Sequence, residues 1–413
     1  MVALQAFVPP TFGDGMPDSH TTSSRTPHHH AALVIVGTGM AGVGLARALR
    51  RQGDTRTITL VSADSGDDYS KPLLSTGFAK RLSSDKLAQR NAEALADELN
   101  AHIVTHTHVT QLDVDNHVLQ LSSGATLGYD ELVLATGAAP HTPFRIPSEL
   151  AERCFTVNDL DDYRRLHGAL NQPTRVAIIG AGLVGCEFAN DLHAGGHQVT
   201  VIAPESAPLP RLLPERLGSA LADTFQEAGI RLALGRTLET LSQDADNALT
   251  LQLDNGERHT VDIILFATGL APRTQLAEAA GLSVSPSGIQ VDRQLRTNQP
   301  HIYALGDAAC IDGVNAMYVQ PLQASVKALA ATLGGTPTSV SFGAWPVVVK
   351  TPLLPVVAYP PTQPPERWRI EGDGNDFTAL AENKDGRLIG FALTGGCVRR
   401  KVELSRAAPG LLG

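Results

Sequence analysis

Short apolar runs alternate with amphipathic stretches along the chain, and one such combination occurs twice. Residues 32–53 read ALVIVGTGMAGVGLARALRRQG, and residues 175–196 read RVAIIGAGLVGCEFANDLHAGG. Each begins with the unbroken apolar run of a buried strand and continues with the spacing of a helix that buries one face. In the first segment this face is marked by Leu45, Ala48 and Leu49. A strand–turn–helix unit is therefore predicted at both places.

A second repeat follows each of these segments. Residues 129–140 read YDELVLATGAAP, and residues 261–272 read VDIILFATGLAP. The second copy is preceded by Asn255 and Gly256, a strong signal for a hairpin turn. The chain is therefore predicted to contain two related α/β units. Its 413 residues leave room for a further domain.

The turn of each unit carries the spacing G-x-G-x-x-G. The motif consists of Gly37, Gly39 and Gly42 in the first unit and of Gly180, Gly182 and Gly185 in the second. One glycine permits the tight turn, one lets the backbone approach a pyrophosphate, and one lets the helix pack on the strand. The helix N-terminus then offers N–H groups to the phosphates. Both units are therefore predicted to bind a dinucleotide.

Acidic residues follow the second strand of each unit, where the ribose of a dinucleotide is commonly held. Asp64 and Glu205 stand just beyond strands whose last positions are taken by Ala63 and Ala203. The ribose contact is therefore expected from these acids or from backbone groups beside them. No arginine directly follows the second strand to accept a 2′-phosphate, although Arg211 stands a little further on. This favours NAD over NADP in the second unit.

The segment TNQPHIYALGDAA, residues 297–309, indicates which unit holds which nucleotide. An apolar strand brings Gly306 and Asp307 to a helix start. An aspartate there can accept hydrogen bonds from a ribityl chain, which only a flavin has, and the alternative is a helix N-cap. Because hydride passes between a nicotinamide and a flavin, we expect FAD in the first unit and NAD(H) in the second.

Composition argues against several other classes of protein. The formal net charge of −9 disfavours a nucleic-acid partner, and no apolar run is long enough for membrane insertion. The cysteines, Cys154, Cys186, Cys310 and Cys397, include no C-x-x-C pair. This argues against a disulfide reductase and a metal site, and it agrees with a cytoplasmic location.

Residues 1–30, rich in Pro, Ser and His, are predicted to form a disordered extension.

Together these motifs resemble the glutathione-reductase-like flavoproteins of the pyridine nucleotide-disulfide oxidoreductase type. The segments YSKPLLSTGFAK, GCEFANDL and VVVKTP resemble more narrowly the rubredoxin–NAD⁺ reductases. The resemblance implies an α/β fold with two Rossmann-like dinucleotide-binding domains, for FAD and NAD, and a small α+β C-terminal domain. The FAD-binding domain would span 31–150 and 270–335, the NAD-binding domain 151–269, and the C-terminal domain 336–413.

The resemblance also implies catalytic residues. Lys71, in a loop fixed by Pro72, and Glu187, near the start of the second helix, would meet beside the flavin N5 atom. Each buried charge would need the other. Lys350, after a strand read as apolar on both faces, would stabilise the reduced flavin from its pyrimidine edge; the alternative is a strand-end lysine in water. Further cofactor contacts are expected at Thr38, Met40, Ala41, Val109, Ala135, Thr136, Gly137, Leu183, Val184, Gly269 and Val319.

The predicted function is the transfer of electrons from NADH through FAD to rubredoxin. Without a thiol pair, electrons must leave from the flavin itself, and the flavin can release them one at a time, which suits a one-electron iron–sulfur or iron protein. The resemblance implies rubredoxin as this partner, feeding for example an alkane hydroxylase. Two alternatives stay open: a ferredoxin reductase serving an oxygenase, and an NADH sensor whose output is a partner interaction. Residues 391–413 hold four basic residues against one acid, which indicates a docking patch or an ordinary solvated helix face.

Overall fold

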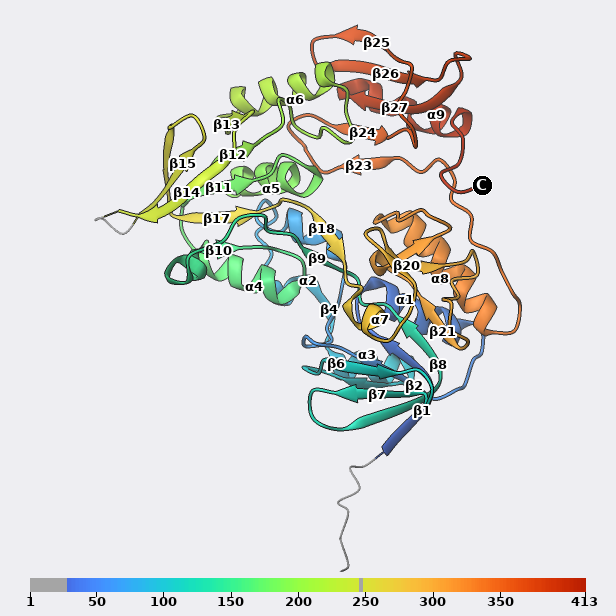
Figure 1. Ribbon diagram of the computed structural model, residues 1–413. Coiled ribbons are helices and arrows are strands. Elements are labelled where there is room, and N and C mark those ends of the chain that lie inside the picture. Colours follow the sequence, from blue (N-terminus) through green and yellow to red (C-terminus); the bar gives the residue numbers. More distant parts are fainter. Residues whose placement is uncertain (1–27, 245–247) are drawn as a thin grey trace, which may run out of the picture.

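The computed structural model describes residues 28–244 and 248–413, which form three units (Figure 1). The first unit is a seven-stranded sheet with the order β5-β2-β1-β8-β7-β6 and with β21 paired to β8. Its strands are β1 (His28–Val36), β2 (Ile58–Val61), β5 (His102–Val104), β6 (Val109–Asp113), β7 (Val118–Leu121), β8 (Thr126–Leu134) and β21 (Ile302–Ala304). Its longer helices are α1 (Met40–Arg51), α3 (Ala92–Leu99) and α8 (Val319–Leu333). Because β21 returns to this sheet after the second unit, the first unit is made from two separate stretches of chain.

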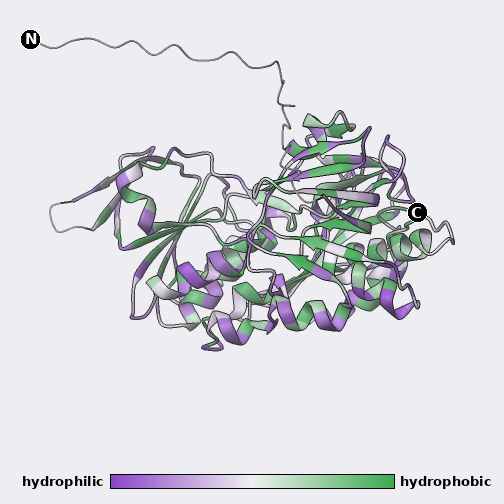
Figure 2. Ribbon diagram, turned by 90° about the horizontal axis from the view of Figure 1, so that it is seen from below, coloured by the Kyte–Doolittle hydropathy of each residue, from purple (hydrophilic) through white to green (hydrophobic). Residues whose placement is uncertain are grey.

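The unbroken apolar run of β1 is explained by its place in the middle of the sheet. Strand β1 pairs in parallel with β2 on one side and with β8 on the other, and its Leu33, Val34 and Ile35 are fully buried. Parallel strands covered on both faces need apolar residues at every position. Around the helices, hydrophobic and hydrophilic residues alternate, as the green and purple segments of Figure 2 show. Helix α1, for example, turns one face inward, whereas α5 (Leu183–Ala194) is buried continuously from Gly185 to Leu192.

The second unit repeats this plan with the parallel order β10-β17-β11-β12-β13. Its strands are β10 (Cys154–Phe155), β11 (Arg175–Ile179), β12 (Gln198–Ala203), β13 (Arg231–Leu234) and β17 (Ile263–Phe266). They are accompanied by α4 (Leu160–Ala169), α5 (Leu183–Ala194), α6 (Glu215–Glu227) and the antiparallel strands β14 (Leu238–Gln243), β15 (Leu249–Leu253) and β16 (Arg258–Val261). The predicted turn at Asn255 and Gly256 joins β15 to β16, with Gly256 at φ 81°. That hairpin prediction is confirmed.

The third unit is an antiparallel sheet with the order β23-β24-β27-β26-β25. Its strands are β23 (Val347–Val349), β24 (Val356–Tyr359), β25 (Arg367–Asp373), β26 (Asp376–Glu382) and β27 (Leu388–Thr394), followed by η4 (Gly395–Arg400) and α9 (Lys401–Ala407). The strand before Lys350 is β23, an edge strand whose Val348 is 56% exposed. Its three valines place apolar side chains on both faces of the sheet, as expected, but only the face of Val347 and Val349 is buried.

Short elements connect the units. They are β3 (Asp68–Tyr69), η1 (Lys71–Thr76), α2 (Ser84–Leu87), β4 (Ala88–Arg90), β9 (Ala138–Pro140), η2 (Ser148–Arg153), β18 (Leu270–Pro272), α7 (Gln275–Ala279), β19 (Val284–Ser285), β20 (Gly288–Val291), η3 (Gly306–Ala308) and β22 (Ala309–Ile311). Strands β9 and β18 pair antiparallel where the chain leaves the first unit and returns to it. The chain crosses between the units on this two-stranded link.

The hydrophobic cores do not follow the predicted domain limits throughout. Leu74, Phe78 and Leu87, from the η1–α2 segment, share a core with the second unit. Phe342 and Leu412, near the two ends of the third unit, pack into the core of the first. The predicted class, two Rossmann-like units and a small third domain, is confirmed, and the domain limits themselves stay a prediction.

The predicted N-terminal extension ends earlier than expected. Strand β1 begins at His28 and pairs with β8 from Thr126 onward, so residues 28–30 belong to the sheet. The strand can continue through these polar residues because its pairing with β8 uses backbone groups and not side chains. Residues 1–27 lie outside the described part. Within residues 28–244 and 248–413, no helix is long and apolar enough to cross a membrane.

Candidate active site

A cavity of about 1860 Å³ is lined by all three units. It takes in most of the residues predicted to bind cofactors, far apart in sequence. They are Gly37, Thr38, Gly39, Met40, Ala41, Ala63, Asp64, Lys71, Pro72, Val109, Ala135, Thr136, Gly137, Gly180, Gly182, Leu183, Val184, Glu187, Glu205, Gly269, Gly306, Asp307, Val319 and Lys350. Gly42 and Gly185 do not line the cavity.

The glycines of the two motifs divide into three kinds. Gly37 and Gly180 have φ of 120° and 113°, and a Cβ on either would clash with a backbone carbonyl of the facing strand-end loop. Gly42 and Gly185 lie under the turn, where a Cβ would clash with the carbonyl of the first glycine of the same motif. At Gly39 and Gly182 a Cβ would meet no atom within 4 Å, and both residues face the cavity. These two positions leave room for a ligand to approach the backbone.

The helices that follow these turns start without a side chain that caps their N–H groups. Helix α1 has Gly39 and helix α5 has Gly182 as N-cap, neither with a side-chain cap hydrogen bond, and neither helix has an acidic residue in its first turn. Free N–H groups and the positive end of a helix dipole suit a phosphate. The two helix starts open on the same cavity. Its walls therefore fit two dinucleotides with their phosphates on opposite units.

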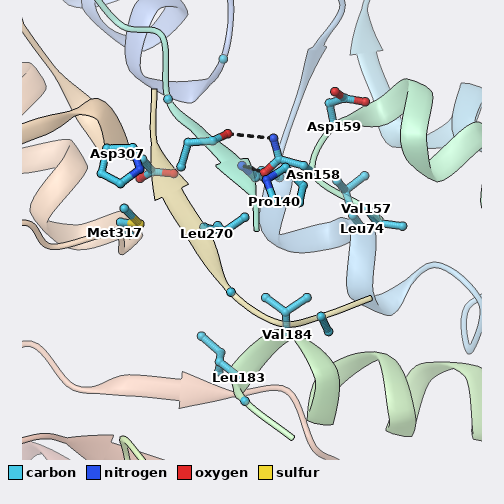
Figure 3. Close-up of a pocket in the computed structure, with 18 of the residues that line it drawn as sticks. Leu74, Pro140, Val157, Asn158, Asp159, Leu183, Val184, Leu270, Asp307 and Met317 are labelled. Carbon is cyan, nitrogen blue, oxygen red and sulfur yellow. Dashed lines mark hydrogen bonds between the residues drawn. The ribbon is translucent and has the colours of Figure 1, made fainter. Parts of the chain in front are cut away.

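Among the charged residues that line the cavity from the first unit, Lys71 and Asp307 act on each other electrostatically. Burial lowers the pKa of Lys71, and the negative charge of Asp307 partly opposes this. Burial likewise raises the pKa of Asp307, with Lys71 opposing. Figure 3 shows Asp307 on one side, Asn158 on the other, and Val184 from the start of α5 below them. The first unit thus brings a buried cation and a buried carboxylate to the same cavity.

Glu187 pairs with Lys350 and not with Lys71. The Lys350 Nζ atom lies 2.5 Å from Glu187 Oε2 and donates to the Pro72 carbonyl and the Ser75 hydroxyl at 2.6 and 2.7 Å. Ser75 donates to Glu187 Oε2 at 2.7 Å, and the Lys350 N–H donates to Oε1 at 3.1 Å. The buried carboxylate is therefore satisfied without Lys71.

The predicted meeting of Lys71 and Glu187 is wrong in this structure. Lys71 stands at the start of η1, and its ammonium donates to Asn158 Oδ1 at 2.7 Å. Glu187 instead faces Ser75, further along η1, and the end of β23. Lys350 was expected to stabilise the reduced flavin with its positive charge. In the structure that charge is neutralised by Glu187. Their roles towards a flavin stay a prediction.

Asn158 and Ser75 are two polar residues of the cavity wall that the sequence reading missed. Asn158 precedes α4, where an Asn-Asp pair reads as a helix cap. Asp159 makes that cap by accepting from the Asp162 N–H at 2.8 Å. The side chain of Asn158 is left for other contacts, and a spare polar residue beside a complete cap was the signal available in the sequence.

The acids predicted to hold ribose both border the cavity. Asp64 lies past the end of β2, where its carboxylate accepts from the Ser62 hydroxyl and from the Gly66 N–H. Glu205 lies past the end of β12, and its carbonyl accepts from the Gly235 N–H at 2.8 Å. Arg211 and Arg236 also line the cavity. Ribose contacts and the preference for NADH over NADPH stay predictions.

No cysteine lines this cavity. Cys154, Cys186 and Cys310 are buried, and none of the cysteines forms a disulfide. Burial raises the pKa of the Cys186 thiol to about 12 and that of Cys154 to about 11, so both stay protonated and unreactive. Within residues 28–244 and 248–413, no cluster of His, Cys, Asp and Glu could hold a metal ion. The site therefore has no protein thiol pair to relay electrons.

The sequence profile of the pyridine nucleotide-disulphide oxidoreductases matches residues 31–330. The chain belongs to this family. A second profile, that of the rubredoxin binding C-terminal domain, matches residues 339–408. The first match spans both dinucleotide units, and the second covers the β23–β27 sheet with η4 and all of α9.

Known relatives agree with these profiles. The chain is 40% identical over 381 residues to the rubredoxin-NAD(+) reductase of Alcanivorax borkumensis, covering 92% of this chain and 99% of that protein. It is 37% identical over 388 residues to the rubredoxin-NAD(+) reductase of Acinetobacter baylyi, covering 92% and 98%. Among solved structures, that of the covalent putidaredoxin reductase–putidaredoxin complex matches with a TM-score of 0.81, 25% identity and coverage of 92% and 94%. The resemblance read from the motifs is confirmed.

Proposed function

We propose that this chain is an FAD-dependent rubredoxin–NAD⁺ reductase that takes electrons from NADH and passes them to rubredoxin. The observation that carries the proposal is the pair of uncapped helix starts, at Gly39 and Gly182, that open on one cavity without a cysteine. Two dinucleotides bound there would share one cavity, as hydride transfer between them requires. The rubredoxin-binding profile over residues 339–408 supports the choice of acceptor.

FAD, when bound, accepts a hydride from NADH and returns the electrons one at a time. The residues of the chain bind and orient the two cofactors. The N–H groups at the start of α1 would hold the FAD phosphates, and those of α5 the NAD(H) phosphates. Asp307 would accept hydrogen bonds from the ribityl hydroxyl groups, and Lys71 would place a positive charge beside the ring system.

Apolar side chains line part of the reacting region and would limit the access of water once the cofactors are bound. Leu183 and Val184 cover it from α5, and Leu74 and Val157 border it from the opposite side (Figure 3). The Glu187–Lys350 pair adds no net charge to this region. The positive charge of Lys71 therefore remains available to the cofactor.

A ferredoxin reductase is the second candidate, because the structure of the putidaredoxin reductase complex matches over nearly the whole chain. The rubredoxin-binding profile and the higher identity of the rubredoxin reductases favour rubredoxin. A pure NADH sensor is not favoured by any feature of the described cavity. We place the protein in the cytoplasm because its cysteines are free, and an alkane hydroxylase as the final electron sink stays a prediction.

Steady-state oxidation of NADH by the FAD-loaded protein separates these functions. We expect fast turnover with rubredoxin, slower turnover with a [2Fe–2S] ferredoxin, and little with neither. A higher kcat/KM with ferredoxin would favour the second candidate. Equal, slow oxidation under all three conditions would contradict any role as a reductase.

A further inference from the structure

Asn158 joins three segments that are far apart in sequence. Its Oδ1 atom accepts from the Lys71 ammonium at 2.7 Å, and its Nδ2 atom donates to the Ala138 carbonyl at 3.0 Å. Lys71 belongs to η1, Ala138 to the linking strand β9, and Asn158 to the loop before α4. The residue is only 5% exposed, yet it lines the cavity. Its side chain therefore connects η1, β9 and the loop before α4, and it also borders the candidate site.

The two partners fix the orientation of the Asn158 amide. A lysine ammonium only donates hydrogen bonds, and a backbone carbonyl only accepts them. The amide must therefore turn its oxygen to Lys71 and its NH₂ group to Ala138. Its own helix does not need this side chain, since Asp159 caps α4. The Asn158 side chain therefore holds Lys71 in place and is not required to cap the helix of the second unit.

The partner of Lys71 is neutral although acidic residues are near. Asp307, Asp159 and Asp162 act on Lys71 through their negative charge, and Arg273 acts in the opposite direction. A carboxylate in direct contact would cancel the lysine charge. A neutral amide holds the ammonium in place and leaves its positive charge to act on a bound ligand.

We propose that Asn158 is a positioning residue that holds the Lys71 ammonium in the cavity as an uncancelled positive charge facing the flavin site. The inference rests on the proposed function, because it assigns Lys71 to the cofactor. Asn158 touches no reacting atom and acts through Lys71. It would also tie the position of that charge to the β9 link between the two dinucleotide units.

The most direct test measures the protonation of Lys71 in the protein freed of FAD. Competitive acetylation at a series of pH values, read by mass spectrometry, gives the pH at which Lys71 becomes reactive. Asn158→Ala removes an acceptor that favours the charged form, so this midpoint should fall by about one pH unit. Asn158→Asp should raise it. Exposed Lys80 and Lys86 serve as internal references and should not change.

A second measurement links Asn158 to the flavin through Lys71. Asn158→Ala should shift the midpoint potential of the bound FAD, and the same substitution in a Lys71→Met background should not. An unchanged Lys71 midpoint in both Asn158 variants, or equal potential shifts in both backgrounds, would overturn the proposal. Asn158→Asp keeps the size of the side chain and preserves the test if Asn158→Ala does not fold.

Failure of this inference is distinguishable from failure of the proposed function. The acetylation experiment needs neither NADH nor rubredoxin, so its outcome does not depend on turnover. Wild-type protein that cannot reduce rubredoxin would contradict the proposed function, whatever the Lys71 midpoint. Normal rubredoxin reduction with unchanged midpoints would contradict only the role of Asn158.

Discussion

Lys71 and Lys350 reach the same cavity from different units but meet different neighbours. Lys350 neutralises Glu187, whose side chain is 7% exposed, and is held further by Pro72 and Ser75. Lys71 is held by the neutral amide of Asn158. Lys350 thus neutralises a buried carboxylate where three units meet. The positive charge of Lys71 is not neutralised by its hydrogen-bond partner.

The Glu187–Lys350 pair can be tested by a double-mutant cycle. Lys350→Met leaves the Glu187 carboxylate buried without a cation, so the free energy of unfolding should fall by about 3–5 kcal/mol. Adding Glu187→Gln should recover most of this loss, because a neutral amide needs no cation. Urea denaturation of the two single variants and the double variant gives the coupling. Additive effects would show that the two side chains do not depend on each other.

Sequence reasoning placed the glycines correctly and the charge pairs incorrectly, for a physical reason. The motif around Gly182 is a local property, since the turn, the helix start and the approach to phosphate all depend on neighbouring residues. The partner of Glu187 depends on how three units pack. The sequence offers two lysines, Lys71 and Lys350, and does not show which of them reaches Glu187. Asn158 was missed because its contacts with Lys71 and Ala138 span distant segments.

At the scale of elements, helices α1 and α5 repeat one design. Both begin at a glycine with extended backbone, φ −66° at Gly39 and φ −75° at Gly182, which other residues can adopt. Gly180, by contrast, has φ 113° and cannot take a side chain without strain. The second glycine of each motif, Gly39 or Gly182, is therefore the position at which a substitution tests ligand binding without straining the backbone.

Gly39→Val and Gly182→Val form a matched pair. Each adds a side chain where a Cβ meets no protein atom within 4 Å, in the space assigned to phosphates. Gly39→Val should weaken FAD binding at least about tenfold, equivalent to ~1.4 kcal/mol, with the second unit intact. Gly182→Val should keep the yellow FAD and weaken NADH binding by a similar factor. FAD fluorescence and rapid-mixing reduction by NADH measure the two effects. The reverse pattern would exchange the nucleotides between the units.

The η1–α2 segment depends on the second unit for its anchor. Asp191, on α5, is buried and accepts from the Phe78 and Ala79 N–H groups at 3.1 and 2.8 Å. Asp191→Ala would leave two donors without a partner and should lower the free energy of unfolding by about 2 kcal/mol. Asp223→Ala, at an exposed position on α6, is the control and should change little. Equal denaturation midpoints for the two variants would rule out this anchor.

At the scale of the whole molecule, charge is unevenly distributed. The chain has a net charge of −9, while η4 and α9 carry exposed Arg399, Lys401 and Arg406. Arg400 is partly engaged, since it donates to Glu403 at 3.2 Å. The exposed helices η4 and α9 agree with the alternative, a solvated helix face, and a contact with rubredoxin stays a prediction. Exposed charges of one sign steer an oppositely charged partner more than they tighten a complex.

Charge reversal tests the docking prediction. Arg399→Glu with Lys401→Glu should raise the apparent KM for rubredoxin several-fold at low salt, because encounter with an acidic partner slows. High salt should remove the difference. Lys384→Glu with Arg387→Glu makes the same change in charge at the other end of β27 and is the control. Equal KM values for the two double variants would exclude η4 and α9 as the docking site.

An anaerobic titration tests the central claim, that electrons pass from NADH through FAD to rubredoxin without a protein thiol. The FAD-loaded protein is reduced stepwise with NADH and then mixed with oxidised rubredoxin while both absorbance spectra are followed. The account predicts that one NADH per FAD completes the reduction and that the reduced protein then reduces two rubredoxins, since each accepts one electron. Consumption of a second NADH per FAD, or failure to reduce rubredoxin, would contradict it.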